Sequence, residues 1–404
     1  GNSEKQKQAK QPYAYLDREI KLNLPDSMLI DYELKVDRIS GLPLQLSDAS
    51  FKGDIIQGIF NVRSVNIKTP GGQLKGALNY QASPKKEPVI DLAVSSTRLD
   101  LNKLLAKKEF GAISKISSAA TSLKVNAQGS SLRKMLSQGT LNLETRNAKL
   151  IFDGKKQQPM QLDSVKVSSI KGKSLQVNLE GKYRDTALKS NITLDSLLNR
   201  LTGTTPLPIK LHSSLGEASF NAEGSVRNIS NFSGLKLDIN LVGQKLQALN
   251  NVLDMKLPAD VVYNLSATLK DNKGKYIFQD INGNIGRSDV NGKLDFLIPD
   301  KNSRPLAVTA WLHSKKLFLD DLLDKEKPAA SEDRDGRSLP AMKIPVDLIK
   351  SLNAELNLTA DNIEIHKVLY KDLQAQLKIG NNRLLIKPLK VGLTGGVINA
   401  SWDT

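Results

Sequence analysis

The chain has 404 residues, a formal net charge of +16, no cysteine and only 5% aromatic residues. The lack of cysteine excludes disulfides, thiol catalysis and cysteine-ligated zinc. The sequence contains no run of about 18 apolar residues of the kind that spans a membrane. The charge favours anionic partners or reflects solvated strand faces, and nucleic acid is disfavoured because basic residues are spread singly and aromatic residues are scarce.

The chain begins with a polar segment, residues 1–12, which we predict to be a disordered tail or an expression remnant. From Ile20 onward, apolar and polar residues alternate with a period of two, as in residues 30–36, 175–179 and 373–379. Each such strand has one apolar and one polar face, which is typical of antiparallel sheets with one wet side. We therefore predict a mostly β fold: an elongated, curled antiparallel sheet of repeated hairpins and roughly 25 strands, forming an apolar groove.

Two distant segments share one pattern. Residues 58–78 align without a gap on residues 382–402, at an offset of 324 residues from Gly71 to Gly395. Each copy predicts a β-hairpin, in which Gly71-Gly72 and Gly395-Gly396 supply the positive φ of a two-residue turn. This repetition favours a repeating β architecture. The apolar residues of the two copies are the candidate groove residues: Phe60, Val62, Val65, Ile67, Leu384, Ile386, Leu389, Val391 and Leu393.

A second recurring unit is a strand that runs into a short Leu-rich turn, at residues 99–105, 192–198, 246–253 and 317–323. We predict one- to two-turn helices there, capped by Asp or Asn and covering sheet edges that would otherwise aggregate. Residues 112–122 are rich in small side chains and are also compatible with a helix.

Composition divides the chain into segments. Residues 13–110 are predicted to be the first groove repeat, residues 111–324 the middle of the groove, and residues 341–404 a second repeat cut short at its end. Residues 325–340 are charged and contain proline, which predicts a flexible loop. The polar start and the abrupt end suggest a piece of a longer protein.

The search for catalytic motifs finds none. His212, His313 and His366 occupy separate strand-like segments without metal-ligand spacing, and no cofactor motif is present. The adjacent carboxylates of Asp320 and Asp321 are expected to point to opposite sides, which favours capping over catalysis. We therefore expect a protein that is not an enzyme and that needs no metal or cofactor.

The Leu-rich apolar faces have two interpretations. They are either the core of an ordinary sandwich or a groove left open for an apolar ligand. Periodicity does not distinguish the two, because both require one apolar face per strand.

Several motifs, taken in order and spacing, resemble the AsmA family of bacterial envelope proteins. They are residues 129–141, 249–258, 280–294 and 317–323, and the closing Gly395-Gly396 hairpin. The resemblance covers nearly the whole chain from about residue 18. It implies the periplasmic part of a protein anchored in the inner membrane of a Gram-negative bacterium, similar to bridge-like lipid-transfer proteins and concerned with phospholipid movement and outer-membrane biogenesis.

The expected function is therefore a non-enzymatic lipid conduit that moves phospholipid across the periplasm. Its expected partners are phospholipid and a membrane surface, with no nucleic acid, and any envelope partner proteins are not specified. The alternative is a scaffolding β protein of envelope assembly that binds no lipid. A carbohydrate-active enzyme on a β scaffold has little support, because no paired carboxylates are evident.

Overall fold

The computed structural model divides the chain into two compact units, residues 1–210 and residues 211–404. The segments predicted from composition do not coincide with these units and stay predictions, and residues 1–12 and 325–340 lie outside the described residues. The described residues are 14–20, 27, 29–39, 46–83, 86–104, 113–152, 159–196, 206–227, 233–250, 261–272, 275–297, 306–322, 352–380 and 383–403.

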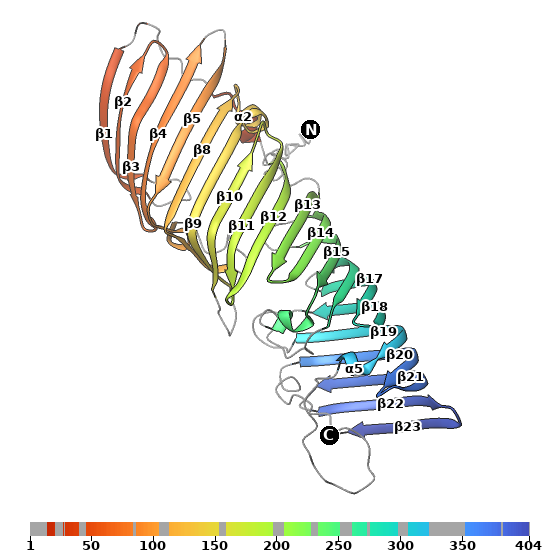
Figure 1. Ribbon diagram of the computed structural model, residues 1–404. Coiled ribbons are helices and arrows are strands. Elements are labelled where there is room, and N and C mark those ends of the chain that lie inside the picture. Colours follow the sequence, from red (N-terminus) through yellow and green to blue (C-terminus); the bar gives the residue numbers. More distant parts are fainter. Residues whose placement is uncertain are drawn as a thin grey trace, which may run out of the picture. The chain divides into compact units, whose positions relative to one another are not determined.

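Unit 1 is an antiparallel sheet in which most neighbouring strands are consecutive in the chain (Figure 1). The strands are β1 (Leu29–Ile39), β2 (Leu46–Ile56), β3 (Ile59–Thr69), β4 (Gly72–Ser83), β5 (Lys86–Ser96), β6 (Leu99–Asp100), β7 (Ile113–Ser118), β8 (Ala120–Gln128), β9 (Thr140–Phe152), β10 (Met160–Ser169), β11 (Ser174–Tyr183) and β12 (Thr186–Ser196). A further strand, β13 (Leu207–Leu215), spans the division between the units.

Residues 112–122, whose small side chains are compatible with a helix, are extended where the structure describes them, in β7 and at the start of β8, which corrects that alternative. Both strands pair with β9, β7 with a register shift between Ile113 and Lys115, and on their other side they pair with β6 and β5. Backbone N–H and C=O groups between two strands need ladder partners. The position in the sheet therefore outweighs the small side chains of this segment.

Unit 2 is also an antiparallel sheet, with one exception. Strands β19 and β20 run parallel, and helix α5 (Leu319–Leu322) follows the end of β19. The other strands are β14 (Ala218–Val226), β15 (Lys236–Gly243), β16 (Tyr263–Asn272), β17 (Lys275–Ile285), β18 (Ser288–Leu297), β19 (Leu306–Phe318), β20 (Leu352–Ile365), β21 (Val368–Gly380), β22 (Arg383–Leu393) and β23 (Gly396–Asp403).

Both predicted hairpins are present. Strands β3 and β4 close at Thr69 opposite Gly72, and β22 and β23 close at Leu393 opposite Gly396. The two-residue turns are thus Pro70-Gly71 and Thr394-Gly395, so the second glycine of each pair begins the next strand. Of the four turn glycines, all within the described residues, only Gly72 has a positive φ, +146°. A Cβ on Gly72 would lie 2.1 Å from the carbonyl oxygen of Arg98, so this glycine permits a close approach of β6.

The two hairpins share a second feature that alternation does not predict. Each has a β-bulge at the equivalent place, between Val62 and Val65 in β3 and between Ile386 and Leu389 in β22. A bulge inserts one residue and so reverses the parity of the strand. As a result, the candidate groove residues before and after each bulge lie on one face of the sheet, although strict alternation would place them on opposite faces.

The described helices are short. They are η1 (Ala14–Asp17), α1 (Leu101–Leu104), α2 (Leu132–Gln138), η3 (Leu246–Leu249) and α5, and within the described residues none is long or apolar enough to cross a membrane. Three of the four predicted Leu-rich turns are helical, and residues 197–200 of the fourth lie outside the described residues. The prediction of a mostly β, curled antiparallel fold with a few short helices is confirmed.

Candidate functional site

Unit 1 holds a cavity of about 410 Å³ on the apolar face of its sheet. Its wall is made by alternate residues of β4, β5 and β8 to β11, with contributions from β6, α1 and β7. Among the described residues that line it, none carries a charge. Its apolar lining residues include Leu74, Leu123, Leu143, Leu162, Val165 and Leu179.

The wall follows directly from strand register. Residues opposite one another on neighbouring strands share a face of the sheet, so an alternating sequence in correct register produces rows of one character. One row crosses six strands through Val94, Leu123, Leu143, Val167, Val177 and Ile192. A shift of one residue in any strand would move its leucines to the wet face.

The sheet must curl for this cavity to exist. Leu74 of β4 and Leu179 of β11 line the same space, yet five strand spacings of about 4.8 Å would separate these strands by about 24 Å in a flat sheet. Bulges between Lys52 and Gly53 and between Leu162 and Ser164 add local bends. The apolar face is therefore the inner face of unit 1.

Helix α1 covers one end of the cavity. Asp100 caps this helix, because its Oδ1 accepts hydrogen bonds from the backbone N–H of Asn102 at 3.1 Å and of Lys103 at 3.4 Å. The Asn102 side chain in turn accepts a hydrogen bond from the N–H of Ile116 in β7 at 2.5 Å. These bonds hold Leu101 against the cavity.

At the α2 end of the sheet, the N-terminal segment docks on the loop and helix that follow β8. The N–H of Ile20 donates to the carbonyl of Ser130 at 2.8 Å, and Leu16 is fully buried. Arg133 binds the Asp17 carboxylate through two hydrogen bonds, of 2.5 and 3.0 Å. Hydrogen bonding to Arg133 outweighs desolvation and lowers the pKa of Asp17 below its usual value. This segment ties a remote part of the chain to the sheet.

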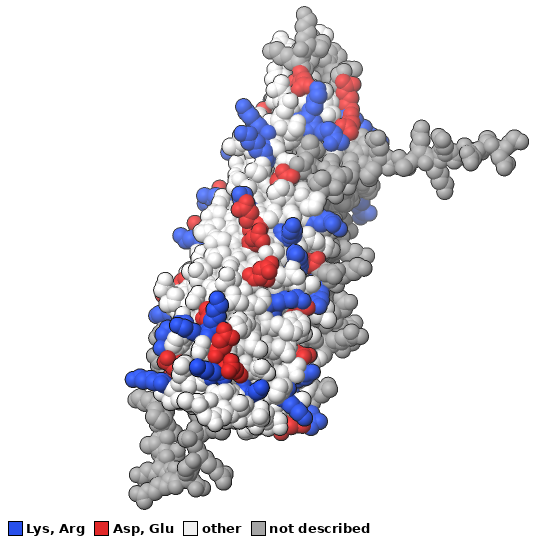
Figure 2. Space-filling view, turned by 90° about the vertical axis from the view of Figure 1, so that its right-hand side faces the viewer, with Lys and Arg blue, Asp and Glu red and all other residues white. Residues whose placement is uncertain are grey.

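The opposite face of unit 1 is polar. Side-chain amides and carboxylates form a ladder across the strands: Asn61 donates to the buried Asp54 at 2.8 Å, Asn79 donates to Asn61, and Asn126 donates to Asp91. A depression of about 480 Å³ lies over this ladder. On the face shown in Figure 2, acidic and basic side chains are interspersed rather than gathered by sign. The ladder stabilises the register that keeps the leucines on the inner face.

Unit 2 also has an apolar face. Across the parallel pair, Ala310 lies opposite Leu356 and Leu317 opposite Ile363, so the apolar rows continue from β19 into β20. A buried cluster forms there from Leu317, Ala360, Ile363, Leu373 and Ala375. At the last described strand, β23, every described side chain is exposed.

The structure places the nine candidate groove residues in two groups. Phe60, Val62, Val65 and Ile67 lie on the inner face of β3 in unit 1, and the other five lie on the apolar face of β22 in unit 2. Val62 and Leu384 are buried, whereas Leu393 is 43% exposed. None of the nine lines the 410 Å³ cavity. Sequence reasoning did not select the cavity residues, because rows of leucine in β8 to β11 look like any half-buried strand.

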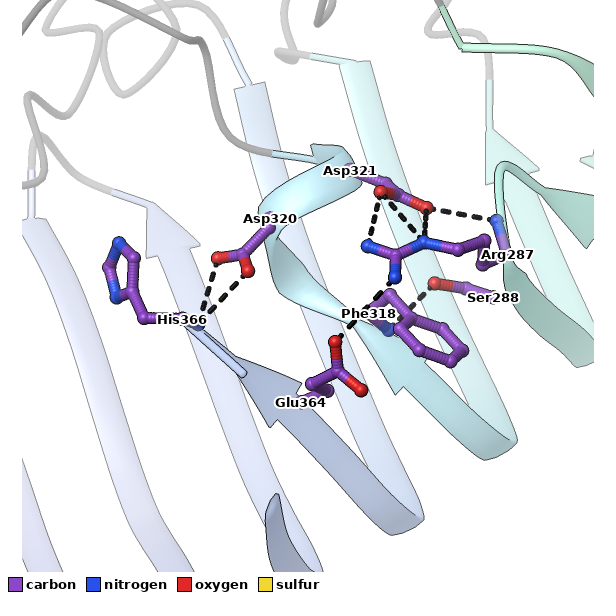
Figure 3. Close-up of polar contacts among 7 residues, drawn as sticks. All are labelled: Arg287, Ser288, Phe318, Asp320, Asp321, Glu364 and His366. Atoms are coloured by element: carbon purple, nitrogen blue, oxygen red, sulfur yellow. Dashed lines mark hydrogen bonds and ion pairs between the residues drawn. The ribbon is translucent and has the colours of Figure 1, made fainter. Parts of the chain in front are cut away.

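The Asp320-Asp321 pair has a different role from the one expected (Figure 3). The two carboxylates do point to opposite sides, but they bind neighbouring hairpin turns. Asp320 accepts the backbone N–H of His366 at 2.9 Å. Asp321 accepts the backbone N–H of Arg287 at 2.9 Å and its guanidinium at 2.8 Å. Hydrogen bonding to Asp321 raises the pKa of Arg287 above its usual value.

Arg287 makes two further contacts. Its guanidinium lies 4.3 Å from the centre of the Phe318 ring and 3.5 Å from the carboxylate of Glu364 (Figure 3). These groups come from the β17–β18 turn, from the end of β19 and from β20. The cluster therefore fixes the start of the parallel crossover, and we assign it a structural role.

Asp289 organises the same region of unit 2. Its carboxylate accepts hydrogen bonds from the backbone N–H groups of Lys315 at 3.0 Å and Lys316 at 2.8 Å. These two residues follow His313, the last residue of β19 that pairs with β18. Burial alone would raise the pKa of Asp289, but hydrogen bonds from Lys315, Lys316 and Ser314 outweigh it and lower the pKa below 3.8.

This lowered pKa predicts an acid-sensitive contribution to stability. A carboxyl group with a depressed folded-state pKa stabilises the fold above its unfolded pKa, and the contribution is lost as pH falls through the folded value. We expect Asp289→Asn to lower the thermal unfolding midpoint at pH 7, with the difference from the original protein shrinking below about pH 4. Midpoints measured from pH 7 to pH 3 test this, and a difference that does not change with pH would contradict it.

Within the described residues, the titratable side chains do not form a catalytic or metal-binding constellation. His212 contacts Asn221, and His313 contacts Thr359 at 3.0 Å. No group of three or more His, Asp or Glu that could hold a metal is found among the residues that the structure describes.

Unit 1 is thus a β-sheet with one wet face and one hollow apolar face, and unit 2 is a β-sheet with an apolar face of its own. In an alignment of 245 residues that covers 55% of its length, the chain is 22% identical to the AsmA family protein YhjG of Escherichia coli strain K12. It covers 35% of that protein, so it spans about a third of the length of this curated relative. No family model matches the chain, and no solved structure matches it. The similarity to YhjG supports the AsmA-family resemblance, and hence an envelope-related family, as the motifs predicted.

Proposed function

We propose that the chain is part of a non-enzymatic lipid conduit that carries phospholipid acyl chains along the inner faces of its sheets. The observation that carries this proposal is the apolar cavity of unit 1, which has no charged residue among its described lining. Burial of one acyl chain of about 16 carbons is worth roughly 12 kcal/mol, at about 0.8 kcal/mol per methylene. An uncharged inner face supplies that stabilisation while head groups stay in water.

The proposal includes a location and a role in the cell. By the family resemblance, the conduit belongs to the periplasmic part of a longer protein anchored in the inner membrane, and it supports outer-membrane biogenesis. Apolar rows run from β19 across β20 to β21 in unit 2. These rows support a second apolar segment there. Phospholipid and a membrane surface are its proposed partners.

The test uses a photo-crosslinking amino acid at Leu179, which lines the cavity, in cells that make the protein. We expect phospholipid adducts at Leu179 and none at the adjacent Glu180, which is exposed on the polar face and serves as the matched control. Substitution at Phe60 and Leu384 extends the scan to the residues selected from the sequence.

The outcome separates the two functions considered. Adducts at Leu179 without adducts at Glu180 support a conduit. The absence of adducts at all inner-face positions, together with purified protein that carries no phospholipid in native mass spectrometry, would instead favour a scaffold that binds no lipid.

A further inference from the structure

Several hydroxyl groups interrupt the apolar wall of the unit 1 cavity, and three of them lie together. Ser118, Thr121 and Thr145 all line it, where β7 and β8 run beside β9. Thr121 lies directly opposite Thr145 in the register, and the next inward-facing pair along the same strands is Leu123 opposite Leu143. The hydroxyls therefore form a polar spot on the inner face, beside Ser96 of β5, which lies opposite Thr121 and donates to the carbonyl of Arg98. Ser95 and Ser117 also line the cavity.

The three hydroxyls are hydrogen-bonded to one another in a chain. Ser118 Oγ lies 2.8 Å from Thr121 Oγ1, which lies 3.3 Å from Thr145 Oγ1. Three hydroxyls carry three protons, and among the described residues these two hydrogen bonds are the ones their side chains make. One O–H donor is therefore left over among three hydroxyls that line the cavity.

The residues that carry the three hydroxyls are only partly buried, so the spare donor is accessible from the cavity. A valine has nearly the shape of threonine but has no O–H to donate to an oxygen that a ligand brings. The spare donor is therefore available to a ligand that brings an acceptor oxygen into the cavity.

The chemistry of the lining selects the kind of oxygen. An ionised carboxylate would need a positive partner when removed from water, and no charged residue is among the described lining. A neutral carbonyl oxygen needs only a donor. Resting on the proposed function, we propose that Ser118, Thr121 and Thr145 bind the ester carbonyl of an acyl lipid, so that the cavity recognises ester-linked acyl chains rather than hydrocarbon in general.

The test compares two lipids that differ only in the carbonyl. Vesicles of diester phosphatidylglycerol and of its diether analogue with the same alkyl chains are offered separately to the purified protein, and bound lipid is quantified. One hydrogen bond corresponds to about a three- to tenfold preference for the diester. In the triple variant Ser118→Ala/Thr121→Val/Thr145→Val, which removes all three hydroxyls, we expect this preference to fall to about one while diether binding is unchanged.

Two further variants complete the design. Ser118→Ala removes one hydroxyl with little change in volume. It leaves Thr121 and Thr145 with one hydrogen bond and one spare donor, so it is expected to keep the preference. Thr193→Val is the matched control, since Thr193 is a strand threonine whose hydroxyl donates to Gln176 at 2.8 Å on the polar face. It is expected to keep the preference of the original protein.

Each result has a distinct meaning. Equal binding of diester and diether lipid by the original protein would overturn the ester assignment while leaving the conduit intact. Tighter binding of oleate than of the diester at pH 8 would overturn it in favour of a carboxylate. A failure to bind either phospholipid would overturn the proposed function itself.

Discussion

Replacement of Leu143 by glutamate is expected to reduce bound phospholipid at least tenfold. Leu143 lies within the inner row between Leu123 and Val167 and lines the cavity of unit 1. A carboxylate there either stays ionised and draws water into the cavity, or takes up a proton at a free-energy cost. Tenfold weaker binding corresponds to a loss of about 1.4 kcal/mol of binding free energy. This loss is smaller than the free-energy cost of moving a charge out of water, so the expected effect is a lower limit.

The neighbouring residue provides the control. Asn142 precedes Leu143 on β9 and is exposed on the polar face, so Asn142→Glu adds the same charge on the wet side and should leave lipid binding unchanged. Leu143→Met keeps an apolar side chain of similar volume and should also bind. Lipid phosphate per protein, measured after incubation with vesicles, reports the result. Retention of lipid by the glutamate variant would show that acyl chains do not use this cavity.

Truncation of Ile363 to alanine is expected to destabilise unit 2 by about 2–5 kcal/mol, the usual range for a buried isoleucine. Ile363 is 2% exposed and lies opposite Leu317 across the parallel pair of β19 and β20. The Ile363 side chain of β20 belongs to the same buried cluster as Leu317 of β19. The cavity left by its truncation therefore falls within this cluster of unit 2.

Intrinsic fluorescence can measure this change separately from unit 1. The chain has two tryptophans, Trp311 and Trp402, and both lie in unit 2. Urea unfolding followed by tryptophan fluorescence therefore reports on unit 2 alone. Leu369→Ala on β21 is the control, since Leu369 is 57% exposed and its truncation should change stability by less than about 0.5 kcal/mol. Similar losses in both variants would argue against a special role for the cluster.

Several departures from the sequence-based predictions have one physical cause. Residues 113–118 are compatible with a helix by composition and instead form β7, since β9 offers ladder partners on one side and β6 on the other. Asp320 and Asp321 were expected to cap their own turn and instead bind turns of other strands. In both cases the partner lies far away in the sequence, so no local pattern identifies it.

The two β-bulges also show that a local sequence pattern does not determine which face of the sheet a residue occupies. The aligned copies at residues 58–78 and 382–402 contain the bulge residues, but alternation alone assigns Val62 and Val65 to opposite faces. The register of β3 against β4 places them together. Pro388, which lacks an N–H to donate, lies in the second bulge, a position where a sheet tolerates proline.

The sequence by itself determined the mostly β fold, the repeated hairpin, the short Leu-rich helices and the AsmA-family resemblance, because period-two alternation and turn residues are local properties of the chain. Only the tertiary structure decided which apolar face closes around a cavity, where β19 and β20 run parallel, and that Ser118, Thr121 and Thr145 meet inside the wall. Those features depend on register and curl, which bring together residues on different strands whose pairing the linear pattern does not specify.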